Sequence, residues 1–87
     1  MVRMFVRHEV ADYDSWRAGY DSFDRSALGV TDHAVYRSLD DPHDVTVSHD
    51  FESAEAAHAF ASAPELENAM RSAGVTSTPT IWFTTPS

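Results

Sequence analysis

Residues 45–60 read VTVSHDFESAEAAHAF, and the hydrophobic period of the chain changes in the middle of this stretch. The first half alternates apolar and polar residues, which is typical of a half-buried β-strand. The second half is rich in alanine and places apolar residues three and four positions apart, which is typical of a helix. Ser53 stands at the junction, where a serine side chain can cap the first turn of a helix. The stretch therefore predicts a strand over residues 45–51 and a helix that begins after Ser53.

The patterns on either side of this stretch predict the remaining elements. Residues 33–39 form an apolar-rich segment that is separated from residues 45–51 by the turn-rich loop DDPHD, so the two strands have hairpin spacing. In chain order we expect a strand over residues 2–10, a helix over residues 13–27, strands over residues 33–39 and 45–51, helices over residues 54–63 and 64–73, and a strand over residues 78–85.

The first predicted helix carries an aromatic stripe. Its members fall at positions i, i+3, i+7, i+10 and i+14, on one helix face: Tyr13, Trp16, Tyr20, Phe23 and Ala27. Asp12 is the expected N-cap, and Gly29 is the expected stop after the last turn. Such a stripe can be ordinary core, and it can also form the wall of a small-molecule pocket.

The order of the elements is βαββαβ, which predicts one α+β domain over residues 1–87 with a ferredoxin-like fold. A four-stranded antiparallel sheet is then covered by helices on one face only. The other face receives Phe5, Tyr36 and Trp82, and contiguous aromatic side chains in such a position usually mark an interface. We expect a homodimer in which two such faces pack together into a closed, barrel-like interior.

Composition excludes several classes of function. The 87 residues contain no cysteine, and fourteen acidic residues face six arginines for a net charge of −8. This acidic chain has no basic stripe for phosphates, which argues against nucleic acid and anionic membrane as partners. It has no apolar run of membrane-spanning length, so the expected location is the cytoplasm. It also lacks nucleophile-elbow, phosphate-loop and dinucleotide motifs.

Two of the five histidines are expected to be neighbours on the helix-covered face of the sheet. If Leu39 lies opposite Val45, then Val35 lies opposite His49, and His33 becomes the diagonal neighbour of His49. Each can be a hydrogen-bonded structural histidine, a group that binds ligand or transfers a proton, or a metal ligand. Of these three possible roles, that of a metal ligand is the weakest hypothesis, because no third ligand lies at close spacing.

The remaining histidines fall into two groups. His8 is expected on the helix-covered face of the first strand near Val45, about 13 Å from His49. The two can flank one pocket from opposite ends but cannot share a metal ion. His58 is expected to face solvent from its helix, and His43 belongs to a turn.

The quoted elements resemble the dimeric α+β barrel superfamily, in particular small antibiotic-biosynthesis-monooxygenase-like proteins. The resemblance rests on MFVRHEV, DYDSWRAGYDSF, HDFESAEAAHAF with the following PELENAM, and TIWFTT, and it spans essentially the whole chain. It implies a pocket between the sheet and the helices of each subunit. Some members of that superfamily oxidise anthrones without metal or flavin, and others cyclise polyketides, degrade haem or bind ligands without turnover. Haem degradation is disfavoured, because His8, Phe60 and Met70 stand where the haem degraders have other residues.

The working hypothesis is a cofactor-independent, monooxygenase-like enzyme that takes a proton from a hydrophobic, enolisable aromatic or polyketide-like substrate. The alternatives are a polyketide cyclase or isomerase that uses no oxygen, and a non-catalytic ligand-binding or stress-responsive barrel. The candidate catalytic residues are His49, His8 and His33, and the candidate substrate-binding residues are Trp16, Tyr20, Phe51, Phe60 and Arg37. No metal and no cofactor is expected.

Overall fold

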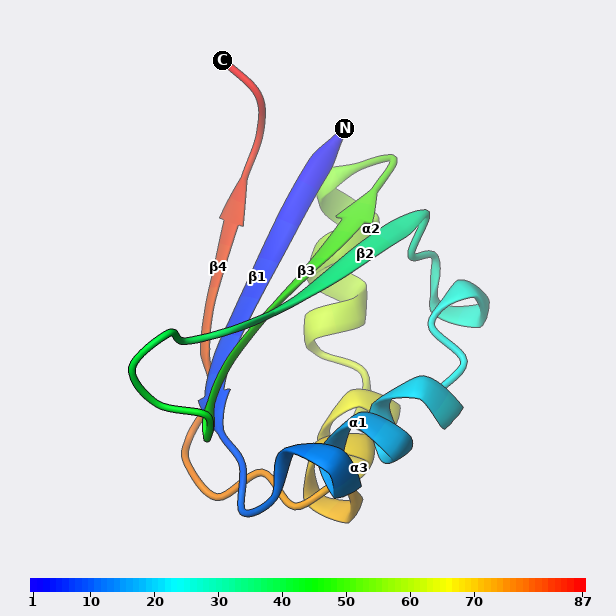
Figure 1. Cartoon of the computed structure of the whole chain (residues 1–87). Helices are drawn as coiled ribbons and strands as arrows, with labels where there is room; N and C mark the ends of the chain where they lie inside the picture. Colours follow the sequence, from blue (N-terminus) through cyan, green and yellow to red (C-terminus); the bar gives the residue numbers. More distant parts are fainter.

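The computed structural model describes residues 1–87 and shows a sheet with helices on one face (Figure 1). The elements in chain order are β1 (Val2–Glu9), α1 (Tyr13–Ser22), a 3₁₀ turn (Ser26–Leu28), β2 (Asp32–Arg37), β3 (Asp44–Phe51), α2 (Ala54–Ala61), α3 (Pro64–Ser72) and β4 (Thr80–Thr84). The strands are antiparallel in the order β2-β3-β1-β4. The predicted α+β, ferredoxin-like fold is confirmed. No helix is both long enough and apolar enough to cross a bilayer.

Polar side chains cap two of the helices at the predicted positions. The Asp12 carboxylate accepts a hydrogen bond from the backbone N–H of Ser15 at 2.9 Å, and the Ser53 hydroxyl accepts one from Ala56 at 3.1 Å. These bonds satisfy N–H groups that have no partner inside the helix. The switch from strand to helix at Ser53 is therefore built into the local sequence.

The helix predicted to reach Ala27 ends earlier, at Ser22, so this part of the prediction was wrong. The Asp24 carboxylate accepts a hydrogen bond from the backbone N–H of Ala27, and the Arg25 guanidinium donates to the carbonyl of Tyr20. Such side-chain bonds to backbone compete with the helical ladder. Gly29 ends the 3₁₀ turn instead, with a φ of 92° that favours glycine.

The predicted register of the β2–β3 hairpin was also wrong, by two residues. Arg37 lies opposite Val45 and His33 lies directly opposite His49, because Leu39 is left outside the ladder in the connecting loop. That loop is closed by a hydrogen bond from the backbone N–H of Asp44 to the carbonyl of Asp41 at 3.1 Å. A shift by two residues preserves the alternation of faces, so the face assignments remain correct.

Two hydrophobic clusters fill the space between the sheet and the helices. The first lies toward α2 and contains Met4, Val6, Val30, Phe51, Ala57, Phe60 and Leu66. The second lies toward α1 and contains Val10, Trp16, Tyr20, Val45 and Val47. The aromatic stripe of α1 thus belongs to the core, and the boundary between the two clusters falls under α1 and α3.

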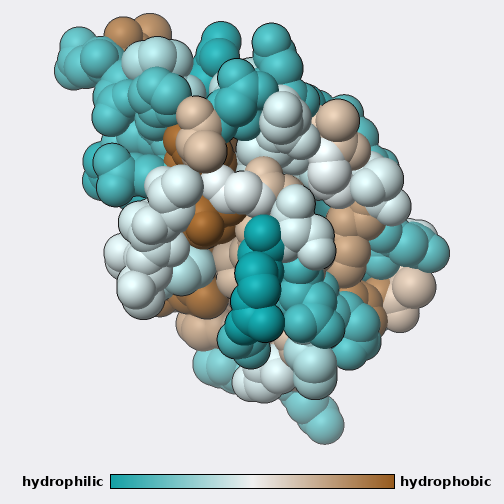
Figure 2. Space-filling model, turned by 90° about the horizontal axis from the view of Figure 1, so that it is seen from below, coloured by the Kyte–Doolittle hydropathy of each residue, from teal (hydrophilic) through white to brown (hydrophobic).

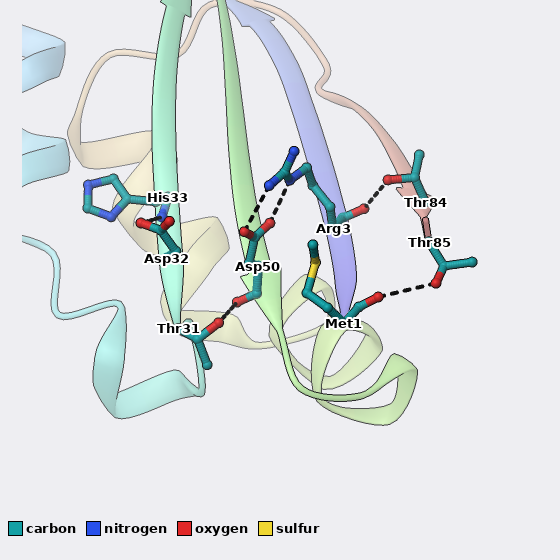
Figure 3. A network of polar contacts seen from close by, with 8 residues as sticks. All are labelled: Met1, Arg3, Thr31, Asp32, His33, Asp50, Thr84 and Thr85. Carbon is teal, nitrogen blue, oxygen red and sulfur yellow. Dashed lines mark hydrogen bonds and ion pairs between the residues drawn. The ribbon is translucent and has the colours of Figure 1, made fainter. Parts of the chain in front are cut away.

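The other face of the sheet has no covering layer (Figure 1). Phe5 stacks on Trp82 with ring centroids 5.2 Å apart, and the side chain of Tyr36 is more than half exposed. A bidentate ion pair joins Arg3 to Asp50 on this face, with N–O distances of 2.7 and 3.0 Å (Figure 3). The uncovered face therefore has aromatic side chains and a well-paired charged group next to them.

Candidate functional site

A small cavity lies under α1 and α3, where the two hydrophobic clusters meet. Its volume is about 30 Å³, which is room for about two water molecules. Twelve residues line it: Val6, His8, Trp16, Gly19, Tyr20, Phe23, Val47, His49, Leu66, Ala69, Met70 and Ala73. No lining residue is an acid, an arginine or a lysine. The cavity is therefore an apolar space whose polar groups are two imidazoles, one indole and one phenol.

His49 of β3 is one of the two buried imidazoles in the cavity wall. Its side chain is almost fully buried, and its Nε2 is hydrogen-bonded to the Tyr20 hydroxyl at 2.8 Å. Its Nδ1 has no hydrogen-bond partner. Burial, with smaller contributions from the positive charge of Arg25 and from His33, lowers the pKa of His49 to about 4. The imidazole is therefore neutral at pH 7.

Tyr20 of α1 holds His49 in an aromatic stack. The phenol ring packs on Trp16 at a centroid distance of 5.1 Å and on the His49 ring at 5.9 Å. The edge of Phe60 meets the His49 ring at 5.0 Å. Burial raises the pKa of Tyr20 to about 12, and the Arg25 guanidinium, 4.4 Å from the ring centroid, partly opposes this rise. Tyr20 therefore keeps its proton and can both donate and accept a hydrogen bond.

His8 of β1 forms the opposite end of the cavity. It pairs with Val45 in the sheet, as predicted, and its ring meets Trp16 at a centroid distance of 5.7 Å. The side chain is 5% exposed and its Nδ1 has no partner. Burial lowers the pKa of His8, and its own backbone and the Asp44 carboxylate oppose this in part. Because His49 pairs with Met4, the two histidines are four residues apart along the strands, about 13 Å.

The other predicted site residues lie outside the cavity wall. The His33 ring meets the Tyr20 ring edge to face from its solvent side, at 5.9 Å, and points away from the Arg3–Asp50 pair (Figure 3). The Arg37 guanidinium lies 4.0 Å above the Tyr13 ring, at the exposed beginning of α1. Phe51 and Phe60 are fully buried in the first hydrophobic cluster, and Phe60 contributes by packing against His49. The structure therefore brings together His8, His49, Trp16 and Tyr20.

The contribution of α3 to the cavity was not predicted from the sequence. Leu66, Met70 and Ala73 lie at positions i, i+4 and i+7, so they share one helix face, and the structure turns that face toward the sheet. The spacing was visible in the sequence. What the spacing did not show is that this helix packs beside α1 and lines the cavity from a second side.

The seam between α1 and α3 is made of small residues. A Cβ atom added at Gly19 of α1 would lie 3.0 Å from the Cβ of Ala73, so the two helices approach closely at this point. Seen from below, at the end where α1 and α3 lie, hydrophobic residues reach the surface in separate patches between hydrophilic ones (Figure 2). The two helices therefore approach closely beside the cavity, where Gly19 and Ala73 both belong to its lining.

The chemistry of the cavity wall, though not its present volume, suits an uncharged, flat ligand with hydrogen-bonding groups. The walls offer aromatic faces for stacking, and the free nitrogens of His8 and His49 offer hydrogen bonds at two ends. A charged ligand would find no counter-charge among the lining residues. No three histidine or carboxylate side chains are arranged so that they could hold a metal ion together.

Comparison with known proteins places the fold. No protein-family model matches the chain, and no curated protein sequence matches it. A structure from Bordetella bronchiseptica with a provisional antibiotic biosynthesis monooxygenase assignment has a TM-score of 0.78 at 15% identity, over 99% of this chain and 96% of that one. A variant of SnoaB, a cofactor-independent oxygenase from Streptomyces nogalater, has a TM-score of 0.71 at 17% identity, over 98% and 91%.

A third structure, from Deinococcus radiodurans and with the same provisional assignment as the Bordetella protein, has a TM-score of 0.71 at 14% identity. The match covers 100% of this chain and 93% of that one. Likeness over whole chains at such low identity establishes a shared backbone architecture. The chain therefore has the fold of the antibiotic-biosynthesis-monooxygenase-like structures.

Proposed function

We propose that the cavity under α1 and α3 binds an uncharged, enolisable aromatic or polyketide-like molecule and that the protein oxidises it as a cofactor-independent monooxygenase. The observation that carries this proposal is the pair of buried, neutral imidazoles, each with an unpartnered Nδ1, in an otherwise apolar wall. An unpartnered buried nitrogen costs stability, and a ligand group that bonds to it removes that cost. The fold of SnoaB, which is described as a cofactor-independent oxygenase, agrees with this chemistry.

The reaction requires a base, and His49 is the proposed one. When Nε2–H donates to the Tyr20 hydroxyl oxygen, Nδ1 carries the free lone pair and can accept the proton from the substrate carbon. The carbanion that remains reduces O₂, and a CH₂ group plus O₂ gives a carbonyl group plus water. Because burial makes His49 a weak base, the substrate must be a carbon acid whose anion is delocalised over its rings.

Binding also requires that the cavity widen. Sites for ligands of this size occupy about 300–1,000 Å³, well above the volume of this cavity. The flexible Met70 and the close but thin seam at Gly19 and Ala73 are the points where α3 can move away from α1. The aromatic stack of Trp16 and Tyr20 would then form one wall around the ligand.

The test is oxygen uptake with an anthrone. The wild-type protein is expected to consume one O₂ per anthrone, and His49→Ala should lower the rate by about 10²-fold or more. His58→Ala is the matched control, because His58 is exposed on α2 and packs on Phe83 away from the cavity. If His49→Ala retains the wild-type rate, the proposed base is wrong.

Two alternatives use the same cavity. In a cyclase or isomerase the proton transfer would proceed without O₂, and the anthrone assay would show product without oxygen uptake. A non-catalytic binding protein is favoured by one observation, the low pKa of His49, since an imidazole that stays neutral down to pH 4 serves well as a hydrogen-bonding group. In that case ligands would raise the melting temperature with no turnover of any substrate.

The uncovered face of the sheet supports a homodimer as the working form. Phe5, Tyr36 and Trp82 are partly exposed beside the ion pair of Arg3 and Asp50, so apolar side chains lie next to polar groups as in known interfaces. Two such sheets can pack face to face about a two-fold axis. The histidines lie on the opposite face of the sheet, so each subunit would keep its own cavity.

A further inference from the structure

Arg25 follows the end of α1, and its guanidinium packs on the Tyr20 ring. The guanidinium carbon lies 4.4 Å from the ring centroid, and Nη1 donates to the Tyr20 carbonyl at 2.6 Å and to the Phe23 carbonyl at 3.3 Å. The last carbonyls of a helix have no partner inside it, and a cation stabilises the negative end of the helix dipole. Since the last turn of α1 contains no basic residue, Arg25 supplies this charge from outside the helix.

The backbone of Arg25 is itself held in place. Its carbonyl accepts hydrogen bonds from the backbone N–H groups of Leu28 and Val30 at 3.1 and 3.3 Å. The side chain is half-buried, and no carboxylate lies within ion-pair distance of the guanidinium, whereas four of the six arginines form such pairs. Arg25 therefore presents a fixed positive charge to the Tyr20 ring.

The contacts of Tyr20 extend from Arg25 to His49. The Tyr20 hydroxyl is hydrogen-bonded to Nε2 of His49 at 2.8 Å, so the ring on which Arg25 packs also orients the imidazole. Burial is the main cause of the lowered pKa of His49, and the charge of Arg25 is the next. His33 of β2 acts in the same direction, and Asp50 of β3 opposes both. Arg25 does not line the cavity, so its contact with the site runs through Tyr20.

We propose that Arg25 is a positioning residue: it fixes the Tyr20 ring so that the hydroxyl stays bonded to His49 and holds the imidazole in one orientation. The inference rests on the proposed function, in which His49 takes the proton from the substrate. A phenol ring that turned away would leave Nε2 without a partner and the imidazole oriented by packing alone. Because a base must lie within hydrogen-bond reach of the proton that it takes, a small displacement of its ring lowers the rate.

The direct test observes His49 by NMR and needs no substrate. In protein with ¹⁵N-labelled histidine, the Nε2 signal at pH 7 reports the hydrogen bond to Tyr20. Arg25→Met keeps a long side chain but removes the charge and both hydrogen bonds, so it should move this signal most of the way to its position in Tyr20→Phe. Arg25→Gln, which tests the same point if the methionine variant unfolds, should move the signal in the same direction, and Arg25→Lys should move it least.

Arg17→Met is the matched control for this test. Arg17 is also an arginine of the α1 region, but it pairs with Asp21 one turn along the helix and has no contact with the Tyr20–His49 pair. The control should leave the Nε2 signal of His49 in place. An unchanged signal in a folded Arg25→Met or Arg25→Gln variant overturns the proposal, whatever the protein's activity.

A second test links Arg25 to the reaction. With an anthrone, Arg25→Met should lower kcat for oxygen uptake by roughly tenfold or more, and it should leave KM nearly unchanged because Arg25 does not line the cavity. The acid limb of the kcat profile should move to higher pH, since loss of the positive charge raises the pKa of His49. Arg25→Lys should restore both. An unchanged kcat, with or without a raised KM, overturns the positioning role. A wild-type protein without oxygen uptake would refute the proposed function instead, and the NMR test would still decide the role of Arg25.

Discussion

At the scale of single residues, the contact between Tyr20 and His49 explains how a polar ring is kept inside an apolar core. The hydroxyl satisfies Nε2 at 2.8 Å, while the unpartnered Nδ1 leaves one nitrogen for a ligand. A buried histidine without any hydrogen bond would cost several kcal/mol, and one with both nitrogens satisfied would be a structural residue only. His49 has one hydrogen-bonded and one unpartnered ring nitrogen, which distinguishes it from a histidine that serves only to pack the core.

Removing the Tyr20 hydroxyl should therefore be costly. Tyr20→Phe leaves both His49 nitrogens without a partner, and urea unfolding should show a loss of about 1–3 kcal/mol in the free energy of unfolding. Tyr13→Phe is the control, because the half-buried Tyr13 hydroxyl accepts only a long bond of 3.4 Å from Arg17, and its loss should cost less than about 0.5 kcal/mol. Equal effects of the two changes would contradict the assigned role of Tyr20.

The pKa of His49 predicts how stability depends on pH. In the unfolded chain the imidazole titrates near its ordinary value of 6.5, and in the folded protein near 4, so the unfolded state binds the proton first as the pH falls. The stability is fully present above pH 6.5 and is lost between about pH 6.5 and pH 4, by roughly 3 kcal/mol from His49. The lowered pKa of His8 adds to this loss in the same direction.

Urea unfolding at pH 7, 5.5 and 4.5 measures this loss. The His49→Gln variant should lose less stability than the wild type over that range, even if it is less stable at pH 7. Asp44 and Asp50, whose pKa is lowered by ion pairs, lose their contribution to stability only as the pH falls below their ordinary value of 3.8. Their effect on stability is therefore separated in pH from that of His49. A variant with the same decrease as the wild type would show that another group is responsible.

At the scale of elements, α1 and α3 decide whether the cavity exists. Their close approach rests on two small residues, Gly19 and Ala73, and other residues of both helices line the cavity. Protein interiors are otherwise packed without voids, so a gap beneath a thin helix contact is a site where the structure can open. The local caps, by contrast, fix where these helices begin and do not control how closely they pack.

A double-mutant cycle at this seam measures the helix contact. Gly19→Ala alone should gain less than the roughly 1 kcal/mol expected from helix propensity, because the new Cβ presses on Ala73 at 3.0 Å. In the Ala73→Gly background, Gly19→Ala should raise the free energy of unfolding by about 0.5 kcal/mol or more beyond its effect in the wild-type background. Equal effects of Gly19→Ala in both backgrounds, measured by urea unfolding, would show that the helices do not touch as described.

At the scale of the whole molecule, the two faces of the sheet have different environments. One face holds the core and the cavity, and the other presents aromatic side chains to solvent. A chain of 87 residues buries a modest share of its surface, so covering the second face would add stability as well as a partner. The fold shared with the oxygenase-like structures fits this two-sided organisation.

The proposed dimer predicts that Trp82→Asp produces a monomer. The charge would enter the centre of the apolar patch, next to Phe5, and could not be paired across a two-fold interface. Sedimentation should show the wild type as a dimer and the variant as a monomer with an unchanged circular dichroism spectrum. Leu39→Asp is the control, because Leu39 is fully exposed in the β2–β3 loop, outside the patch. A wild-type protein that is monomeric at high concentration would refute the dimer.

The sequence by itself determined the order of the elements, the faces of the strands and the caps at Asp12 and Ser53. These features depend on hydrophobic period and on side chains within a few residues of each other, so the local sequence is enough to determine them. The tertiary structure alone decided the register of His33 against His49, the early end of α1 and the contribution of α3 to the cavity wall. Alternation defines a face but not a pairing partner, and the volume of a cavity depends on how side chains from β1, β3, α1 and α3 pack together. Those contacts join residues far apart in the chain, and only the folded molecule brings them into place.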